Sequence, residues 1–365
     1  MKTTKLFFMA ALALMTAACS NDDNDFAQQP SNGEITITAT LDSNDGATTR
    51  ALSIDGSNIA STWETTDEFA ILFNDGTSNV KRTATVQSIN GSNVTITFTI
   101  PQSLANNTAC TIVYPASAAN AANTGADVNA ALATQDGTID NCPEVRVGTA
   151  TIDKSTHSLS SVTKLAAQNA IFKFTTKNSD ASATINVKPL TVTIGAQNYV
   201  ITPASATSEL FVALPAISGQ AVSFSATDGS KTYTCSKDGI SFDEGKYYQS
   251  TLKMALNKIT WNSFPTSGMD FSYSKDGITL TAEVLDWGNG SIEAQYDEGK
   301  FTSSIGNFKK IEITADEFNM GAGWTVSGNK ATWTGNASTV TFCSNDWHPS
   351  VYWSFTPLTM TFYFQ

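Results

Sequence analysis

The stretch Val94-Thr95-Ile96-Thr97-Phe98-Thr99-Ile100 alternates apolar and hydroxyl-bearing residues without interruption. Because successive side chains of a strand point to opposite faces of a sheet, this alternation predicts a strand with one buried and one solvated face. The same period of two recurs at residues 35–41, 351–355 and 358–364. Clusters of Gly, Asn and Asp separate such runs, and no long window repeats at a helical period. We therefore predict an all-β fold of tandem β-sandwich domains.

The amino-terminal segment has the composition of an export signal. Two lysines precede an apolar run over residues 6–15, which ends at Thr16-Ala17-Ala18-Cys19. Roughly 7–15 apolar residues make the core of a signal peptide, whereas a spanning helix needs about 20, so residues 1–18 are predicted to be a removed signal peptide. The thiol of Cys19 is then the candidate lipidation site of a bacterial lipoprotein. The alternative is ordinary signal cleavage that happens to leave a cysteine.

Charge and cysteine usage narrow the classes of partner and cofactor. The net charge of −12 and the pI near 4.6 argue against nucleic-acid and anionic-membrane partners, since both require a basic patch. No segment after the leader is apolar enough to span a bilayer, so the expected membrane link is lipid on Cys19. The spacing of the other cysteines, Cys110, Cys142, Cys235 and Cys343, does not match a metal-binding motif, so we expect no metal or cofactor. We expect these cysteines to be buried single thiols, and the possibility of disulfides between them stays open.

Composition shifts along the chain suggest three domains behind a tether. Residues 19–32 are acidic and polar and are predicted to be a solvated linker. The predicted domains are an N-terminal β-sandwich at 33–160, a second at 161–257 and a tryptophan-rich β domain at 258–365, which holds every tryptophan except Trp63. The Ala- and Asn-rich run at 116–125 is expected to be a loop, too small and polar for a core.

Candidate ligand-binding residues are few, and no pattern indicates an enzyme. Large aromatic residues usually fill sandwich cores, so core packing is expected for most tryptophans. Trp347 and His348 are the exception, because they lie in a stretch expected to be an exposed loop. The other histidine is His157, and neither histidine belongs to a hydrolase, metalloprotease or phosphate-loop motif. We therefore expect no enzyme activity.

Several stretches together resemble the fimbrillin family of Bacteroidetes, which are two-domain β-sandwich subunits of protease-assembled surface fimbriae. The resemblance spans about residues 33–257. It is carried, in this order, by the strand at 35–41, ATTRAL (47–52), WETTDEFAILF (63–73), VYPAS (113–117), QDG (135–137), the strand at 164–174 and the closing strand at 244–252. The segment after residue 257 lies outside it.

This resemblance implies a lipidated precursor at the outer face of the outer membrane, which an Arg-specific protease cuts between Arg50 and Ala51. The strand at 35–41 would then leave, and a strand from another fimbrial subunit would replace it, as in donor-strand complementation. The alternative for Arg50 is a loop arginine that is never cut. The implied function is a structural or adhesive subunit of surface fimbriae, with a host or glycan ligand left open.

Two further alternatives concern the C-terminal region. The last strand, with Leu358, Met360, Phe362 and Phe364 on one face, is either a candidate donor strand or the last core strand of its own domain, paired as a hairpin with residues 351–355. We favour the core strand. The alternative function for the whole chain is a permanently anchored glycan-binding surface lipoprotein that uses the tryptophan-rich domain.

Overall fold

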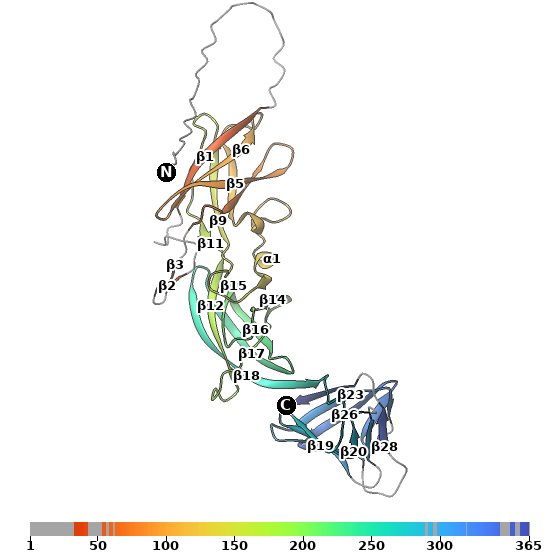
Figure 1. Ribbon diagram of the computed structural model, residues 1–365. Helices are drawn as coiled ribbons and strands as arrows, with labels where there is room; N and C mark the ends of the chain where they lie inside the picture. Colours follow the sequence, from red (N-terminus) through yellow and green to blue (C-terminus); the bar gives the residue numbers. More distant parts are fainter. Residues whose placement is uncertain are drawn as a thin grey trace, which may run out of the picture.

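The computed structural model describes residues 33–42, 53–55, 58–60, 63–288, 291–294, 298–318, 320–343, 351–354 and 358–364. Figure 1 shows an elongated molecule with a bend before its C-terminal domain. The all-β prediction is confirmed: the described residues are mostly strands, with one short α-helix, α1 (Val128–Leu132), and one 3-10 turn, η1 (Ala116–Ala118). The predicted site residues Cys19, Arg50, Ala51, Trp347 and His348 lie outside the described residues.

The first sheet contains the strand predicted at residues 94–100. Its order is β1 (Glu34–Asp42), β6 (Asn93–Pro101), β5 (Asn79–Asn90), β4 (Glu68–Asn74), β7 (Thr108–Tyr114), β9 (Arg146–Asp153) and β10 (Ser158–Ser160), with β11 (Ala166–Ala167) beside β9. A separate short ladder joins β2 (Ser53–Asp55) to β3 (Asn58–Ala60). The alternation in β6 works as predicted, because Val94, Ile96, Phe98 and Ile100 are buried in the first core.

Strand β4 is buried on both faces. Phe69 and Ile71 pack into the first core, while Ala70 and Leu72 pack into the core of the middle domain. A strand covered on both sides reads as a continuous apolar run rather than an alternating one, which is the pattern of residues 69–73. The first and middle domains therefore share one strand as a common wall.

A second sheet runs through both the middle and the C-terminal domain. Its order among the described residues is β25 (Trp324–Ser327), β26 (Lys330–Ala337), β23 (Phe308–Thr314), β29 (Thr359–Phe364), β18 (Tyr247–Trp261), β17 (Lys231–Phe242), β16 (Ile217–Thr227), β13 (Leu190–Ile194), β14 (Gln197–Ile201) and β8 (Thr134–Gln135). Strand β12 (Asn169–Asn178) pairs with β15 (Glu209–Pro215) and, in parallel, with β18.

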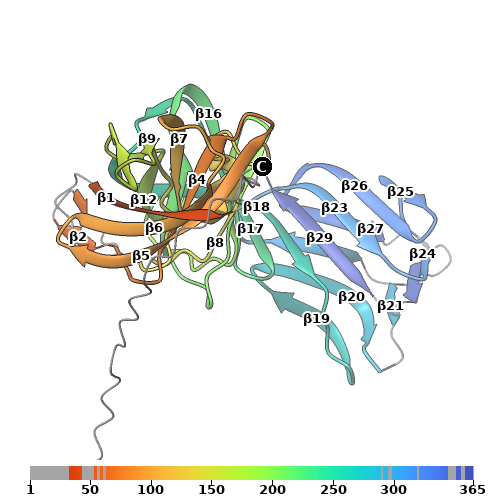
Figure 2. The same cartoon turned by 90° about the horizontal axis from the view of Figure 1, so that it is seen from above.

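Strand β18 is the covalent and hydrogen-bonded link between two cores. It is 15 residues long. Leu252 and Met254 belong to the middle core, whereas Ile259 and Trp261 belong to the C-terminal core. Figure 2 shows β17 and β18 between the C-terminal domain and the rest of the molecule.

The run at 116–125 is not merely a loop, and the expectation that it lies outside any core is wrong at its start. Ala116 and Ala118, in η1, are buried in the middle core together with Leu132. Small side chains allow the turn to approach the sheets closely, so low side-chain volume here reflects close packing.

The segment after α1 closes the free edge of β15 with a side chain. The Gln135 amide donates to the Ala213 carbonyl at 2.8 Å, and its oxygen accepts the Ala213 N–H at 2.8 Å. Gly137 follows with φ +79°, and a Cβ at this position would lie 2.7 Å from Leu210. Only glycine fits such a left-handed close approach, which explains the QDG stretch at 135–137 physically.

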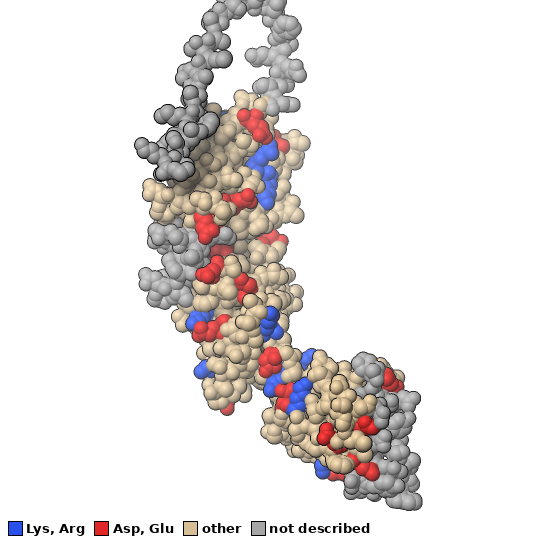
Figure 3. All heavy atoms as spheres, in the orientation of Figure 1, with Lys and Arg blue, Asp and Glu red and all other residues tan. Residues whose placement is uncertain are grey.

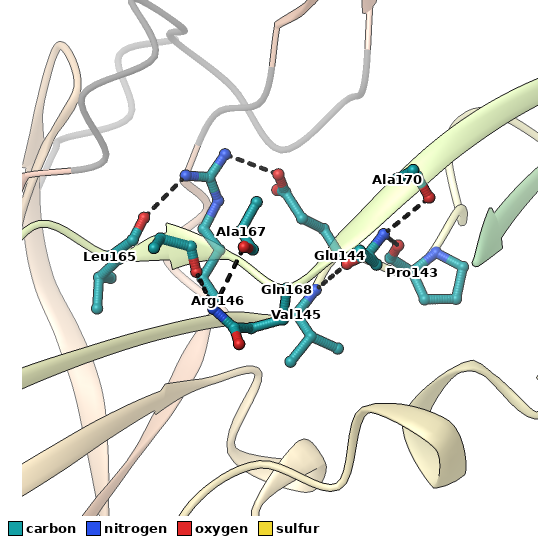
Figure 4. A network of polar contacts seen from close by, with 10 residues as sticks. Pro143, Glu144, Val145, Arg146, Leu165, Ala167, Gln168 and Ala170 are labelled. Carbon is teal, nitrogen blue, oxygen red and sulfur yellow. Dashed lines mark hydrogen bonds and ion pairs between the residues drawn. The ribbon is translucent and has the colours of Figure 1, made fainter. Parts of the chain in front are cut away.

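A buried polar network lies where the chain passes from the first to the middle domain (Figure 4). The Arg146 guanidinium donates to the Glu144 carboxylate at 2.7 Å and to the Leu165 carbonyl at 3.2 Å. The Asn169 side chain accepts the Val145 N–H at 2.9 Å. Removing either member of this ion pair would leave a charge with little access to water, so both residues are expected to be needed for the stability of the junction.

The third sheet covers the C-terminal core from the other side. Its order among the described residues is β24 (Glu317–Phe318), β28 (Val351–Ser354), β21 (Ser291–Ala294), β20 (Ile278–Asp286), β22 (Gly299–Ser303) and β27 (Thr339–Cys343), with β19 (Met269–Lys275) beside β20. Strand β28 pairs with β21 and β24, so the expected hairpin between residues 351–355 and 358–364 is wrong. The two strands lie in opposite sheets instead.

Candidate strand-exchange site

Strand β1 is joined to the first sheet along its whole length by one neighbour. Its nine residues pair antiparallel with β6, from Glu34 opposite Pro101 to Asp42 opposite Asn93. On its inner face Ile37 and Leu41 are fully buried, and Ala39 is 6 % exposed. The strand therefore supplies both a backbone ladder and an apolar face to the first core.

Among the described residues, the other edge of β1 faces the turn before β10 rather than a second full-length strand. The Thr38 N–H donates to the His157 carbonyl at 3.1 Å, in the turn before β10. In an antiparallel ladder the residues that alternate with the hydrogen-bonded ones direct their backbone groups away from the neighbouring strand, so Glu34, Thr36 and Thr40 share the orientation of Thr38. No sequence pattern predicted this contact of His157, which accepts the hydrogen bond from Thr38 through its backbone carbonyl. The backbone of His157 is left-handed, with φ 53°.

A polar hollow opens beside the start of β1. It encloses about 640 Å³ and is lined by Glu34, Ile35, Thr36, Gln102, Asn106, Lys154, Ser155 and His157. The Lys154 ammonium donates to the carbonyls of Gln102 and Leu104, the latter at 2.7 Å. The hollow thus has a polar lining, drawn from the start of β1 and from the β9–β10 turn.

The ion pair between Glu34 and Arg82 contributes little to the docking of β1. Glu34 lies 3.7 Å from Arg82, and 56 % of the Glu34 side chain is exposed. Exposed pairs at such distances are worth about 0–1 kcal/mol. The strand is held mainly by its ladder with β6 and by its buried apolar residues.

The candidate donor strand β29 lies inside its own sheet. It pairs antiparallel with β18 on one edge and with β23 on the other. All four of its inward residues are buried in the C-terminal core, with exposed fractions of 5 %, 0 %, 0 % and 6 % for Leu358, Met360, Phe362 and Phe364. Use of β29 as a donor, the alternative to the favoured core strand, would require it to leave two neighbours and a core.

The described tryptophans pack inward. Trp63 lies in the first core, and Trp261 and Trp287 are buried in the C-terminal core. Trp324 and Trp333 are partly buried against the same core, and the Trp324 indole donates to the Thr341 carbonyl at 3.1 Å. Core packing is therefore the arrangement of Trp63, Trp261 and Trp287, whereas Trp324 and Trp333 stay partly exposed.

The thiols of Cys110, Cys142 and Cys235 are free, and the side chain of Cys343 lies outside the described residues. Cys110 and Cys142 are buried, and Cys235 is partly buried. Burial raises the pKa of the Cys110 thiol to about 12, because the thiolate would lose its hydration. Among the described residues no cluster of His, Cys, Asp and Glu could hold a metal ion, and no helix is long and apolar enough to cross a membrane.

Neither a protein-family model nor a curated protein matches the sequence. Several solved structures are similar. A protein of Bacteroides uniformis whose proposed role is cell adhesion is 14 % identical, with a TM-score of 0.32 over 71 % of this chain and 100 % of that one. A fimbrial assembly protein of Parabacteroides distasonis is 10 % identical, with a TM-score of 0.34 over 70 % and 98 %.

A fimbrial protein of Bacteroides ovatus is 14 % identical, with a TM-score of 0.27 over 62 % of this chain and 52 % of that one. These descriptions name the same class of protein as the sequence resemblance. Similarity at these TM-scores does not by itself establish a function for this chain.

Proposed function

We propose that this protein is a structural or adhesive subunit of cell-surface fimbriae, exported as an outer-membrane lipoprotein and matured by cleavage between Arg50 and Ala51. The observation that carries the proposal is the docking of β1, which pairs along its full length with β6 and buries Ile37, Ala39 and Leu41 in the first core. Such a strand can be replaced by any strand with the same alternation. The protein would then polymerise through strand exchange with other fimbrial subunits.

Cleavage would change the competition for the β1 position. While β1 is part of the chain, its effective concentration beside β6 is very high, and a strand from another subunit cannot displace it. After cleavage β1 is a separate peptide, and loss of Ile37 and Leu41 exposes apolar surface worth about 1.5–3 kcal/mol for each side chain. The exposed core and the open edge of β6 would then favour capture of a neighbour's strand.

The arginines of the chain support Arg50 as the cleavage position. The sequence has three arginines. Arg82 lies within β5 and Arg146 within β9, where it is 3 % exposed. Proteases act on exposed chain outside regular structure, so an Arg-specific enzyme would find both strand positions unfavourable.

Arginine substitution tests the maturation step. Arg50→Ala should leave a full-length precursor that does not polymerise, while Arg82→Ala, the matched control, should mature and assemble normally. The measurement is intact mass and polymer size of material released from the cell surface. Assembly of Arg50→Ala at the normal level, or mature chains that do not begin at Ala51, would contradict the proposal.

Lipidation is tested separately at Cys19, the residue that follows the predicted signal peptide. Cys19→Ser should abolish acyl labelling and release the protein from the outer-membrane fraction, because lipid is the only anchor proposed for it. Acyl label that persists on Cys19→Ser would refute the lipoprotein assignment without bearing on strand exchange.

A further inference from the structure

The outer face of the second sheet is polar where it covers the C-terminal core. Inward residues of β29 and β23 are buried, whereas their outward neighbours are threonines and charged residues. Pairing places these outward residues in rows across four strands. One row joins Lys258, Tyr363, Lys310 and Thr334, and the next joins Thr260, Thr361, Glu312 and Thr332.

Two lysines on this face share one carboxylate. The ammonium groups of Lys310 and Lys330 lie 3.1 Å and 2.7 Å from the same oxygen of Glu312. The Tyr363 hydroxyl donates to the other oxygen at 2.8 Å, and Lys310 lies 4.0 Å from the centre of the Tyr363 ring. We call Lys258, Lys310, Lys330, Glu312 and Tyr363 the lysine–tyrosine face.

The charges of this face do not cancel. Burial raises the pKa of Glu312, but hydrogen bonds from Lys330, Tyr363 and Lys310 outweigh that effect and lower the pKa to about 2. At neutral pH one negative charge therefore faces two ammonium groups that lie close together, and Lys258 lies opposite Tyr363 on the adjacent strand. This local excess of positive charge stands out in a chain of net charge −12.

The residues around the lysines indicate which kind of anionic ligand would fit this face. Threonine hydroxyls from four strands flank them, and hydroxyls both donate and accept hydrogen bonds as sugar hydroxyls do. Figure 3 shows blue and red spheres side by side where the C-terminal domain meets the middle domain. The face is the outer surface of four paired strands, and side chains in rows along a sheet suit an extended polymer.

We infer that the lysine–tyrosine face binds an acidic polysaccharide. The paired ammonium groups of Lys310 and Lys330 would hold a carboxylate or sulfate group, Tyr363 would contact a sugar ring, and the threonine rows would bind sugar hydroxyls. The inference concerns the adhesive part of the proposed function. Binding requires neither cleavage nor strand exchange, so it is measurable on the uncleaved monomer.

The test is binding of the purified full chain to immobilised polygalacturonic acid and dextran sulfate at low salt, with uncharged dextran for comparison. Lys310→Gln and Lys330→Gln should each weaken polyanion binding about tenfold, because each removes a charge-assisted hydrogen bond. Preference for polygalacturonic acid would identify a uronic-acid ligand, and preference for dextran sulfate a sulfated one.

Two further variants keep the test decisive. Lys300→Gln is the matched control: Lys300 is a half-exposed lysine 2.8 Å from Glu298, a one-to-one pair on the opposite sheet, and its loss should change affinity less than about twofold. Glu312→Gln keeps the shape of the side chain but removes the competing carboxylate, so it should strengthen polyanion binding. A network with only a structural role would not produce that gain.

Equal binding by the wild type, Lys310→Gln and Lys330→Gln would overturn the inference, as would equal loss in Lys300→Gln. Dextran binding as strong as polyanion binding would also overturn it, since charge would then play no part. Any of these results would leave the strand-exchange proposal standing, because that proposal is tested by measuring cleavage and polymer size.

Discussion

Phe362 provides the sharpest test of where the last strand belongs. Its ring is fully buried and lies 4.9 Å from Trp261, 5.3 Å from Phe301 and 5.6 Å from Phe308, measured between ring centroids. The neighbouring rings come from β18, β22 and β23, so this one side chain ties together both sheets of the C-terminal domain. Its removal should leave a cavity that these rings cannot fill.

The expected cost of Phe362→Ala is about 3–5 kcal/mol of the free energy of unfolding, the usual range for a buried phenylalanine. A single domain has roughly 5–15 kcal/mol in total, so the C-terminal core should become marginally stable. With a urea dependence of about 1–3 kcal/mol per molar, its unfolding midpoint should fall by about 2 M.

Tryptophan fluorescence follows this transition selectively, because all tryptophans except Trp63 lie after residue 257. Thr359→Ala is the matched control on the same strand, since Thr359 points outward and should cost less than about 1 kcal/mol. If Phe362→Ala unfolds at the wild-type urea concentration, β29 is not part of its own core. The donor-strand assignment would then replace the packing described above.

Three other predictions concern single polar or thiol groups. Gln135→Ala should cost about 1–3 kcal/mol, because the backbone groups of Ala213 lose their partners, and hydrogen exchange at the Ala213 amide should accelerate; unchanged exchange would contradict the clamp. The folded-state pKa of Glu312 is depressed from 4.5 to about 2, so the stability that its carboxylate contributes is present above pH 4.5 and is lost as the pH falls toward 2. The difference in unfolding free energy between wild type and Glu312→Gln, measured by urea unfolding, should therefore shrink between pH 4.5 and pH 2. A constant difference would argue against the ion pairs. Cys110 should react with a thiol reagent only after unfolding, given its burial and a pKa near 12, and rapid labelling of the native protein would show that the first core is open there.

Much of the architecture followed from local patterns in the sequence. Period-two alternation located β1, β6 and β29. These predictions succeed because which residues face inward depends only on the pleat of the strand. The inward packing of the described tryptophans was expected on a different ground, because large aromatic residues usually fill sandwich cores.

Pairing between strands was not predictable in the same way. Proximity in sequence suggested a hairpin for β28 and β29, yet β29 lies between β18 and β23 in the opposite sheet. Likewise, alanines at 116 and 118 looked too small for a core until the structure brought two domains against them. Both errors arise because the partner of a strand or turn is chosen by the packing of distant segments.

The sequence by itself determined the strand class, the inward faces, the absence of helical periodicity and the candidate positions Cys19 and Arg50. Only the tertiary structure decided that β1 is held along one edge, that Gln135 closes the edge of β15, and that Lys310 and Lys330 share the carboxylate of Glu312. The physical reason is range: side-chain alternation is encoded within a few neighbouring residues, whereas the meeting of Lys330 with Glu312, or of Gln135 with Ala213, depends on the register of strands far apart in the chain.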